Sequence, residues 1–294
     1  MIAPLGTLLS STFHNCRERL RPLLIGVVLF GSLIAIVSAV SNRRIEGHIW
    51  DGMHRLGVDQ SRIMELQEQL RSGDEGAVEA AMAEMNTMMG GVDSMSEDER
   101  DALFRREGLA MMLRALPVMS VGIFAWAVIS LLATAYYLFF SLGKGKDAVE
   151  ILGNSVHAVF PLLGVWIWSF IRSFAWIPLI GIIPAVILGP RFALAPVILV
   201  TQNKGVMGSV AESYAKTRGY WGKIVGNLLV LGCILMLVSW AVSLVTIPLA
   251  VMSRVLSIWI HAVVQQGTMA YGVMFLVLLT KTILEQTHGM TKKK

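Results

Sequence analysis

The sequence contains few charged residues for its length. Asp, Glu, Lys and Arg make up 15% of the 294 residues, whereas 55% are hydrophobic. A soluble globular domain carries about 25% charged residues. The charges are also confined to the N-terminus, one long polar stretch, two short basic stretches and the tail, with long apolar runs between them. This pattern indicates a bilayer protein, in which each helical span needs about 20 apolar residues to cross roughly 30 Å of hydrocarbon.

Cysteine is nearly absent. Cys16 lies before the first apolar run and Cys233 lies inside a later one. We expect the two thiols at different levels of the membrane, so a disulfide between them is not expected. The chain has no CxxC pair and no cluster of metal ligands. The sequence therefore predicts no metal site and no cofactor.

Familiar catalytic motifs are missing as well. The chain contains no GxSxG, HExxH or GxxxxGK[ST] pattern, the arrangements that serve serine hydrolases, zinc proteases and nucleotide hydrolases. Acidic residues are numerous only in one polar stretch, where solvated helix faces explain them. We therefore expect no catalytic residues and a non-enzymatic protein. A membrane-embedded enzyme would need a polar cluster that only tertiary folding assembles, and the sequence leaves that alternative open.

The net charge of +5 does not point to nucleic acid. The basic residues flank apolar runs, where they set the orientation of membrane spans. The predicted fold is an all-α, polytopic transmembrane helical bundle of about six spans, with a helical extramembrane insertion between spans 1 and 2. No nucleic-acid partner is expected.

The first span is predicted at residues 23–40. A basic N-terminus, residues 1–22, precedes it, and Arg17, Arg19 and Arg21 place this end in the cytoplasm. The stretch before the apolar run is long, and the run exceeds the roughly 7–15 residues of a signal-peptide core. We therefore predict a retained span.

Residues 41–114 form an acidic extracytoplasmic insertion. They hold nine arginines and no lysine against fifteen Asp and Glu, a net charge of −6. Ile63, Leu66 and Leu70 recur at helical spacing. Ser96 and Glu99 have the spacing of a capping box, which predicts a helix that starts there and runs toward residue 116.

The membrane bundle is predicted over residues 115–284, followed by a basic cytoplasmic tail, residues 285–294. Its first span covers about 116–142, with Tyr136 and Tyr137 suited to the interface and Lys144 and Lys146 beyond it. The last two spans are predicted at about 224–248 and 258–284. Six crossings place both termini in the cytoplasm, in a multi-pass protein of the plasma (inner) membrane.

Residues 156–200 are apolar but repeatedly interrupted. Basic residues flank the segment on both sides, so it must cross an even number of times. Two spans with a turn near 175–181 fit its length, and a broken or re-entrant hairpin is the alternative. The interruptions are Arg172, Pro178, Pro184, Pro190, Arg191 and Pro196.

The two arginines of this segment have different explanations. For Arg172 we favour snorkelling to the interface, beside neighbouring tryptophans. Arg191 could instead bind backbone carbonyls that Pro196 frees, or the headgroup of an anionic lipid. An intramembrane cation is a functional hypothesis by default.

Residues 205–221 are predicted to form an amphipathic helix on the inner surface. Gly219 can adopt a positive φ, which would let this helix stop, and Trp221 would anchor the turn at the interface. Basic side chains near the surface attract anionic headgroups by about 1 kcal/mol each. Three of them accompany the turn: Lys216, Arg218 and Lys223. The GxxxG spacing of Gly222 and Gly226 also suggests close helix packing.

Residues 190–226 resemble the signature of the glycerophosphoryl diester phosphodiesterase membrane-domain family and its uncharacterised polytopic inner-membrane relatives. In that family an arginine and a proline end a span, and a surface helix with a serine, a glycine and a tryptophan leads into the next span. The matching residues are Arg191, Pro196, Ser213, Gly219 and Trp221. The long acidic insertion departs from a simple family member.

The resemblance implies a membrane module and does not imply hydrolase activity. Family members named as phosphodiesterases carry a separate soluble catalytic domain with metal-binding acids and histidines, which does not appear in these 294 residues. The expected function is a structural or lipid-interacting module whose partners are anionic headgroups at the inner surface. A second copy or another membrane protein could also pack against the spans. The alternative is a transporter or channel subunit with a site at the broken helices around 172–196.

Overall fold

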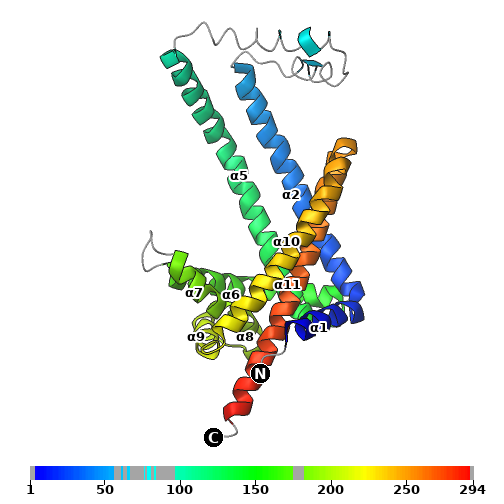
Figure 1. Cartoon of the computed structure of the whole chain (residues 1–294), viewed down its shortest axis with the longest axis vertical. Coiled ribbons are helices and arrows are strands. Elements are labelled where there is room, and N and C mark those ends of the chain that lie inside the picture. The colour runs from blue at the N-terminus through cyan, green and yellow to red at the C-terminus, as the bar shows by residue number, and fades with distance from the viewer. Residues whose placement is uncertain are drawn as a thin grey trace. The chain divides into compact units, whose positions relative to one another are not determined.

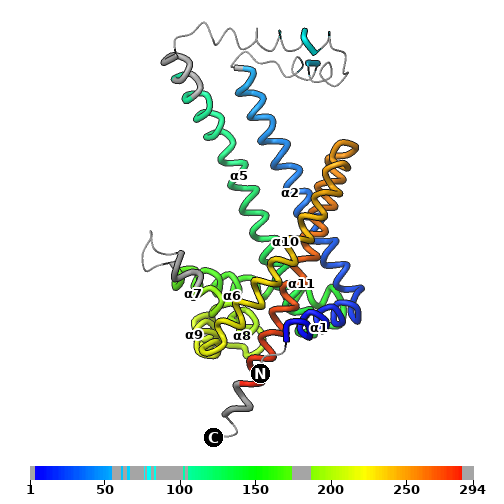
Figure 2. Tube along the Cα trace, viewed as in Figure 1, coloured from blue at the N-terminus to red at the C-terminus, as the bar shows by residue number. Residues whose placement is uncertain are grey.

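The described part of the chain consists of α-helices joined by short links, without a strand. The computed structural model describes residues 4–55, 61, 65–66, 76, 78–80, 83, 97–174 and 182–291 (Figures 1 and 2). The chain divides into two compact units, residues 37–125 and residues 1–36 together with 126–294. The principal helices are α1 Leu5–Glu18, α2 Leu20–Arg55, α5 Glu97–Ser141, α6 Ala148–Phe174, α7 Ile182–Phe192, α8 Ala195–Gln202, α9 Val206–Lys216, α10 Trp221–Met252 and α11 Arg254–Thr291.

Five of the described helices are long and apolar enough to cross a membrane, by length and composition. This confirms an all-α, polytopic membrane protein. Many of their large apolar side chains are exposed, as expected of surfaces that face lipid rather than water. The candidate spans are Leu20–His54, Arg105–Ser141, Ala148–Ser173, Trp221–Met252 and Arg254–Gln286.

The remaining predicted crossing, in the second half of residues 156–200, differs from the expectation. It consists of two short helices, because α7 ends at Phe192 and α8 begins at Ala195. Pro196 lies in the first turn of α8. Pro196 has no N–H to donate to the Phe192 carbonyl, four residues earlier. In a continuous helix its ring would also clash with that carbonyl. The predicted turn at 175–181 lies outside the described residues.

The helices beside the insertion are longer than predicted. Helix α2 continues past residue 40 to Arg55, and α5 begins at Glu97 and runs through Pro117 to Ser141. The predicted helix toward residue 116 and the following span are thus one helix. Ser96, Ile63 and Leu70 lie outside the described residues, so the capping box and the helix predicted from that spacing stay predictions.

The N-terminal stretch contains a helix that its basic residues did not reveal. Leu8 of α1 is buried against α11, and the Tyr271 hydroxyl donates to the Leu9 carbonyl at 3.0 Å. Just after α1, the Arg19 guanidinium donates to the carbonyls of Phe140 (2.8 Å) and Gly145 (2.7 Å). Arg19 therefore stabilises the C-terminal end of α5, where helical carbonyls have no partner within the helix.

An aromatic cluster joins α2 to the end of α5. The rings of Phe30, Tyr136 and Tyr137 are buried and meet edge to face, with centroids 5.5 to 6.1 Å apart. The Tyr136 hydroxyl donates to the Pro22 carbonyl at 2.7 Å, and the Tyr137 hydroxyl to Gln266 at 3.2 Å. The expectation that these tyrosines lie at the depth of the membrane interface stays a prediction, but their rings face the interior of the bundle and not lipid. Their hydroxyls find partners inside the bundle, which allows full burial.

Glycine permits the close approach of α2 to α11. A Cβ added to Gly31 would lie 2.7 Å from the Cα of Val263, a backbone atom that cannot rotate away. The predicted GxxxG face behaves differently. A Cβ added at Gly222 or Gly226 would meet nothing within 4 Å, so these glycines do not serve helix packing within the described chain.

We predict that Gly31→Ala destabilises the protein by about 1–3 kcal/mol, because the added methyl group forces α2 away from α11. Thermal unfolding in a neutral detergent measures the effect. Gly232→Ala is the matched control, since its Cβ would meet nothing within 4 Å in α10. Equal unfolding temperatures for the two variants would show that α2 and α11 do not pack as closely as described.

Candidate functional site

The predicted elbow residues gather around the end of α7. Helices α6, α7, α8 and α9 lie together, at the same end of their unit as the last turn of α5 and the first turn of α10 (Figure 1). Helix α9 packs against α6, α7 and α8. The elbow, residues 206–223, comprises α9, the turn after it and the start of α10.

A free backbone carbonyl is the centre of this arrangement. The last carbonyls of a helix have no intrahelical partner, and the break after Phe192 leaves the Arg191 carbonyl in that position. The Ser213 hydroxyl donates to it at 2.6 Å. The Thr217 hydroxyl lies 3.5 Å away and has a nearer acceptor in the Ser213 carbonyl, at 2.9 Å. Ser213 and Thr217 are both fully buried. The side chains of α9 therefore cap α7 from outside.

Trp221 makes a second connection to α7. It is the first residue of α10, and its indole N–H donates to the Ile187 carbonyl at 2.9 Å. The sequence predicted an interfacial anchor for this residue. The structure adds a defined partner for the indole, so the start of α10 is held against α7.

The side chain of Arg191 lies over an aromatic ring. Its guanidinium carbon is 4.9 Å from the centroid of Tyr214, and the ring of Phe192 lies 6.2 Å from the same centroid. This is the geometry of a cation–π contact. The buried Nε of Arg191 has no hydrogen-bond partner among the described residues. Two partners were expected for Arg191. The first, a freed backbone carbonyl, is not bound by this nitrogen. The second, an anionic headgroup, stays a prediction.

Gly219 gives the elbow its bend. Its φ is 88°, as the sequence predicted, and it lies between the end of α9 and the start of α10. A side chain at this φ would be strained, whereas glycine is not. The prediction of a positive φ is confirmed.

The basic residues of the elbow are not equivalent. Glu212 forms ion pairs with Lys204 and with Lys216, the latter at 2.9 Å. The Lys216 side chain is only 14% exposed and is paired with Glu212. Contact of Lys216 with headgroups stays a prediction, and this ion pair would compete with it. Arg218 and Lys223 are exposed. They are the elbow cations that remain open to an outside partner.

The sequence did not identify Glu212 as a site residue, although its spacing of four from Lys216 on a helix predicts an ion pair between them. Burial alone would raise the pKa of Glu212, but hydrogen bonds and charges from Lys204 and Lys216 outweigh it and hold the pKa below its ordinary value of 4.5. The bonds of Thr217 to Arg191 and of Trp221 to Ile187 were also missed, because only tertiary folding brings these residues together.

Arg172 lies at the end of α6 with an exposed side chain, and its guanidinium carbon is 6.0 Å from the ring centroid of Trp168. This position is compatible with the predicted snorkelling. Cys16 and Cys233 are free thiols. Burial raises the pKa of Cys16 to about 11.

Within the described ranges, no three His, Cys, Asp or Glu side chains are grouped so that they could hold a metal ion. Comparison of the chain with family models, with curated proteins and with solved structures finds no match.

We predict that Ser213→Ala lowers the free energy of unfolding by about 1–3 kcal/mol, because the buried Arg191 carbonyl loses its main donor. Thermal unfolding in detergent measures the change. Ser243→Ala is the control, since among the described residues the Ser243 hydroxyl bonds only to the Ser239 carbonyl of its own helix, at 3.0 Å. A loss for Ser213→Ala no larger than for the control would contradict the capping role.

A second prediction concerns acid sensitivity. The pKa of Glu212 is lowered in the folded protein, so its contribution to stability is present above pH 4.5 and is lost as the pH falls through the folded pKa. Glu212→Gln should remove this part of the acid sensitivity and should destabilise the protein at pH 7. The measurement is the unfolding temperature of both proteins between pH 7 and pH 3. Parallel curves would refute the prediction.

Proposed function

We propose that this protein is a non-enzymatic membrane module that interacts with anionic lipids through its elbow. The observation that carries the proposal is that Arg218 and Lys223 are exposed beside Trp221. By contrast, Lys216 is paired with Glu212, and the Trp221 indole is hydrogen-bonded to α7. Cations next to a membrane surface attract anionic headgroups by about 1 kcal/mol each. The bond of Trp221 to α7 would hold both cations in a fixed place.

The proposed location is the plasma (inner) membrane, with both termini and the elbow in the cytoplasm. This orientation requires that α6, α7 and α8 together return the chain to the side from which α6 starts, so that the crossings are even in number. The support comes from charge. Lys144 and Lys146 follow the C-terminal end of α5. Arg17, Arg19 and Arg21 lie around the start of α2, before the first apolar run. Basic residues beside membrane spans favour the cytoplasmic side.

The proposed family is the membrane-domain relatives of glycerophosphoryl diester phosphodiesterases. The support is that the residues carrying the resemblance have connected structural roles. Ser213 caps the helix that ends near Arg191, Pro196 starts the next helix, Gly219 bends the chain and Trp221 holds α10. Such roles would explain why a family retains these residue types.

A transporter or channel subunit is the second candidate. The observation that favours it is the break between α7 and α8 in an otherwise apolar segment, since discontinuous helices build the binding sites of many transporters. Loss of solute flux from proteoliposomes carrying Pro196→Ala together with Arg191→Gln would support this function. Flux unchanged by both substitutions would exclude a site at these residues.

The lipid proposal predicts that Arg218→Glu with Lys223→Glu lowers the preference for phosphatidylglycerol over phosphatidylcholine at least tenfold, because two attractive charges of about 1 kcal/mol each become repulsive. The measurement is the ratio of the two lipids that stays bound to protein extracted from vesicles containing equal amounts of both, by mass spectrometry.

The control is Arg105→Glu with Arg106→Glu, which makes the same change in net charge at exposed residues of α5. If the elbow variant retains the lipid ratio of the control, the elbow is not the lipid-binding surface and the proposal fails.

A further inference from the structure

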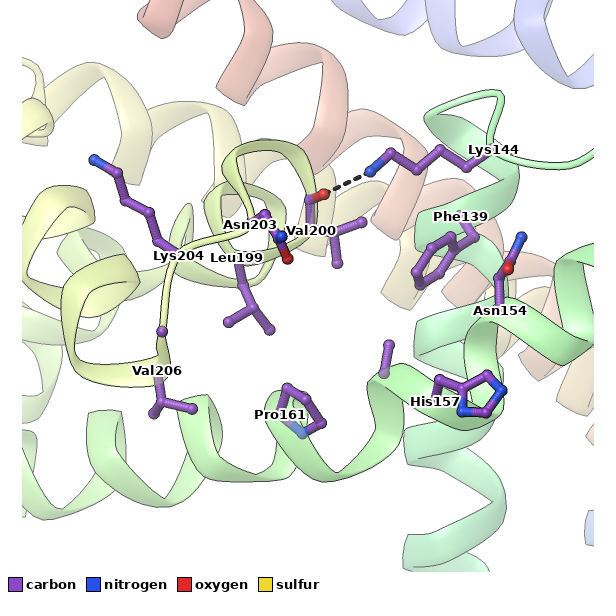
Figure 3. Close-up of a pocket in the computed structure, with 12 residues that line it drawn as sticks. Phe139, Lys144, Asn154, His157, Pro161, Leu199, Val200, Asn203, Lys204 and Val206 are labelled. Atoms are coloured by element: carbon purple, nitrogen blue, oxygen red, sulfur yellow. Dashed lines mark hydrogen bonds between the residues drawn. The ribbon is translucent and has the colours of Figure 1, made fainter.

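A cavity of about 610 Å³ lies beside the elbow, between the end of α5, helix α6 and the link from α8 to α9 (Figure 3). Its volume falls in the range of 300–1,000 Å³ that is typical of sites for small molecules. None of its lining residues was singled out as a ligand site by the sequence.

One side of the cavity is apolar. Its wall is formed by Phe139, Ala158, Pro161, Leu199 and Val206. Figure 3 shows Phe139, Pro161, Leu199 and Val206 around the open space. These side chains come from α5, α6, α8 and the start of α9, so the wall exists only in the folded protein. It offers a surface for hydrocarbon and no partner for a charge.

The other side carries one available cation. The Lys144 ammonium donates to the Val200 carbonyl at 2.6 Å and lies 6.0 Å from the ring centroid of Phe139. Among the described residues it forms no ion pair, and the residue is exposed. Lys204 also lines the cavity, but its ammonium is bound by Glu212. Figure 3 shows its side chain leading away from the open space.

Polar side chains extend the site around Lys144. Asn154 and His157 come from α6, and Asn203 ends α8 with a φ of 53°. An amide and an imidazole can both donate hydrogen bonds. The cavity thus combines, at its rim, the Lys144 ammonium with amide and imidazole donors, and it adds an apolar wall.

We propose that this cavity binds one anionic phospholipid, with the phosphate at Lys144 and the amides of Asn154 and Asn203, and with an acyl chain against the apolar wall. Lys144 follows the last residue of a candidate span, Ser141, and Asn203 directly follows α8. The rim therefore lies where a span ends, at headgroup level, and basic pockets between membrane helices bind anionic headgroups there. The site deepens the lipid-binding function proposed above but shares neither Arg218 nor Lys223 with the elbow.

The test measures binding to purified protein in a neutral detergent by isothermal titration calorimetry. The probes are dioctanoyl phosphatidylglycerol, dioctanoyl phosphatidylcholine and inorganic phosphate. We expect saturable binding of phosphatidylglycerol, at least tenfold weaker binding of phosphatidylcholine, and at least tenfold weaker binding of phosphatidylglycerol to Lys144→Gln. Lys146→Gln is the matched control, because Lys146 is an exposed cation two residues away that does not line the cavity.

Asn203→Gly is a second variant that removes a rim donor while glycine keeps the positive φ, and it should weaken phosphatidylglycerol binding at least threefold even if Lys144→Gln fails to fold. Phosphate binding as tight as phosphatidylglycerol would identify a soluble anion as the ligand and overturn the lipid proposal. Equal binding to wild type, Lys144→Gln and Asn203→Gly would overturn the site. Loss of binding in Arg218→Glu with Lys223→Glu, with Lys144→Gln unaffected, would place the lipid on the elbow instead.

Discussion

The arrangement around the elbow depends on one backbone constraint. Pro196 has no N–H to donate to the Phe192 carbonyl, and α7 ends at that residue, whereas α5 continues through Pro117. The break after Phe192 frees carbonyls in an apolar segment, where an unsatisfied polar group costs free energy. Ser213 donates to one of these carbonyls, that of Arg191, and Trp221 donates to the Ile187 carbonyl one turn earlier in α7. A local defect in one helix is thereby converted into a tertiary connection among α7, α9 and α10.

The same connection determines where the charges lie. Because Ser213 is buried against α7, the opposite face of α9 and the turn after it carry the exposed positions. Glu212 of this helix pairs with Lys204 and Lys216, whereas Arg218 and Lys223 are exposed. The cations around the elbow therefore differ by partner and by position, not by residue type.

Much of the fold could be predicted from hydropathy and charge alone. The helical membrane bundle, the bend at Gly219 and the segregation of basic residues all follow from local sequence. The short helices α7 and α8 were harder to predict, since their summed length equals that of one span. The burial of Tyr136 and Tyr137 was missed because their partners, Pro22 and Gln266, lie far away in the sequence. The resemblance drew attention to Ser213, but only the structure assigns its hydroxyl to a carbonyl 22 residues earlier.

The most direct test of this account is a double-mutant cycle with Ser213→Ala and Trp221→Phe, read as the free energy of unfolding in detergent. If both donors hold one junction, losing the first loosens the second. The double variant should then lose less stability than the two single losses combined, by about 0.5–3 kcal/mol. Losses that add to within about 0.5 kcal/mol would show two independent contacts and would contradict the elbow as a single unit built on the end of α7.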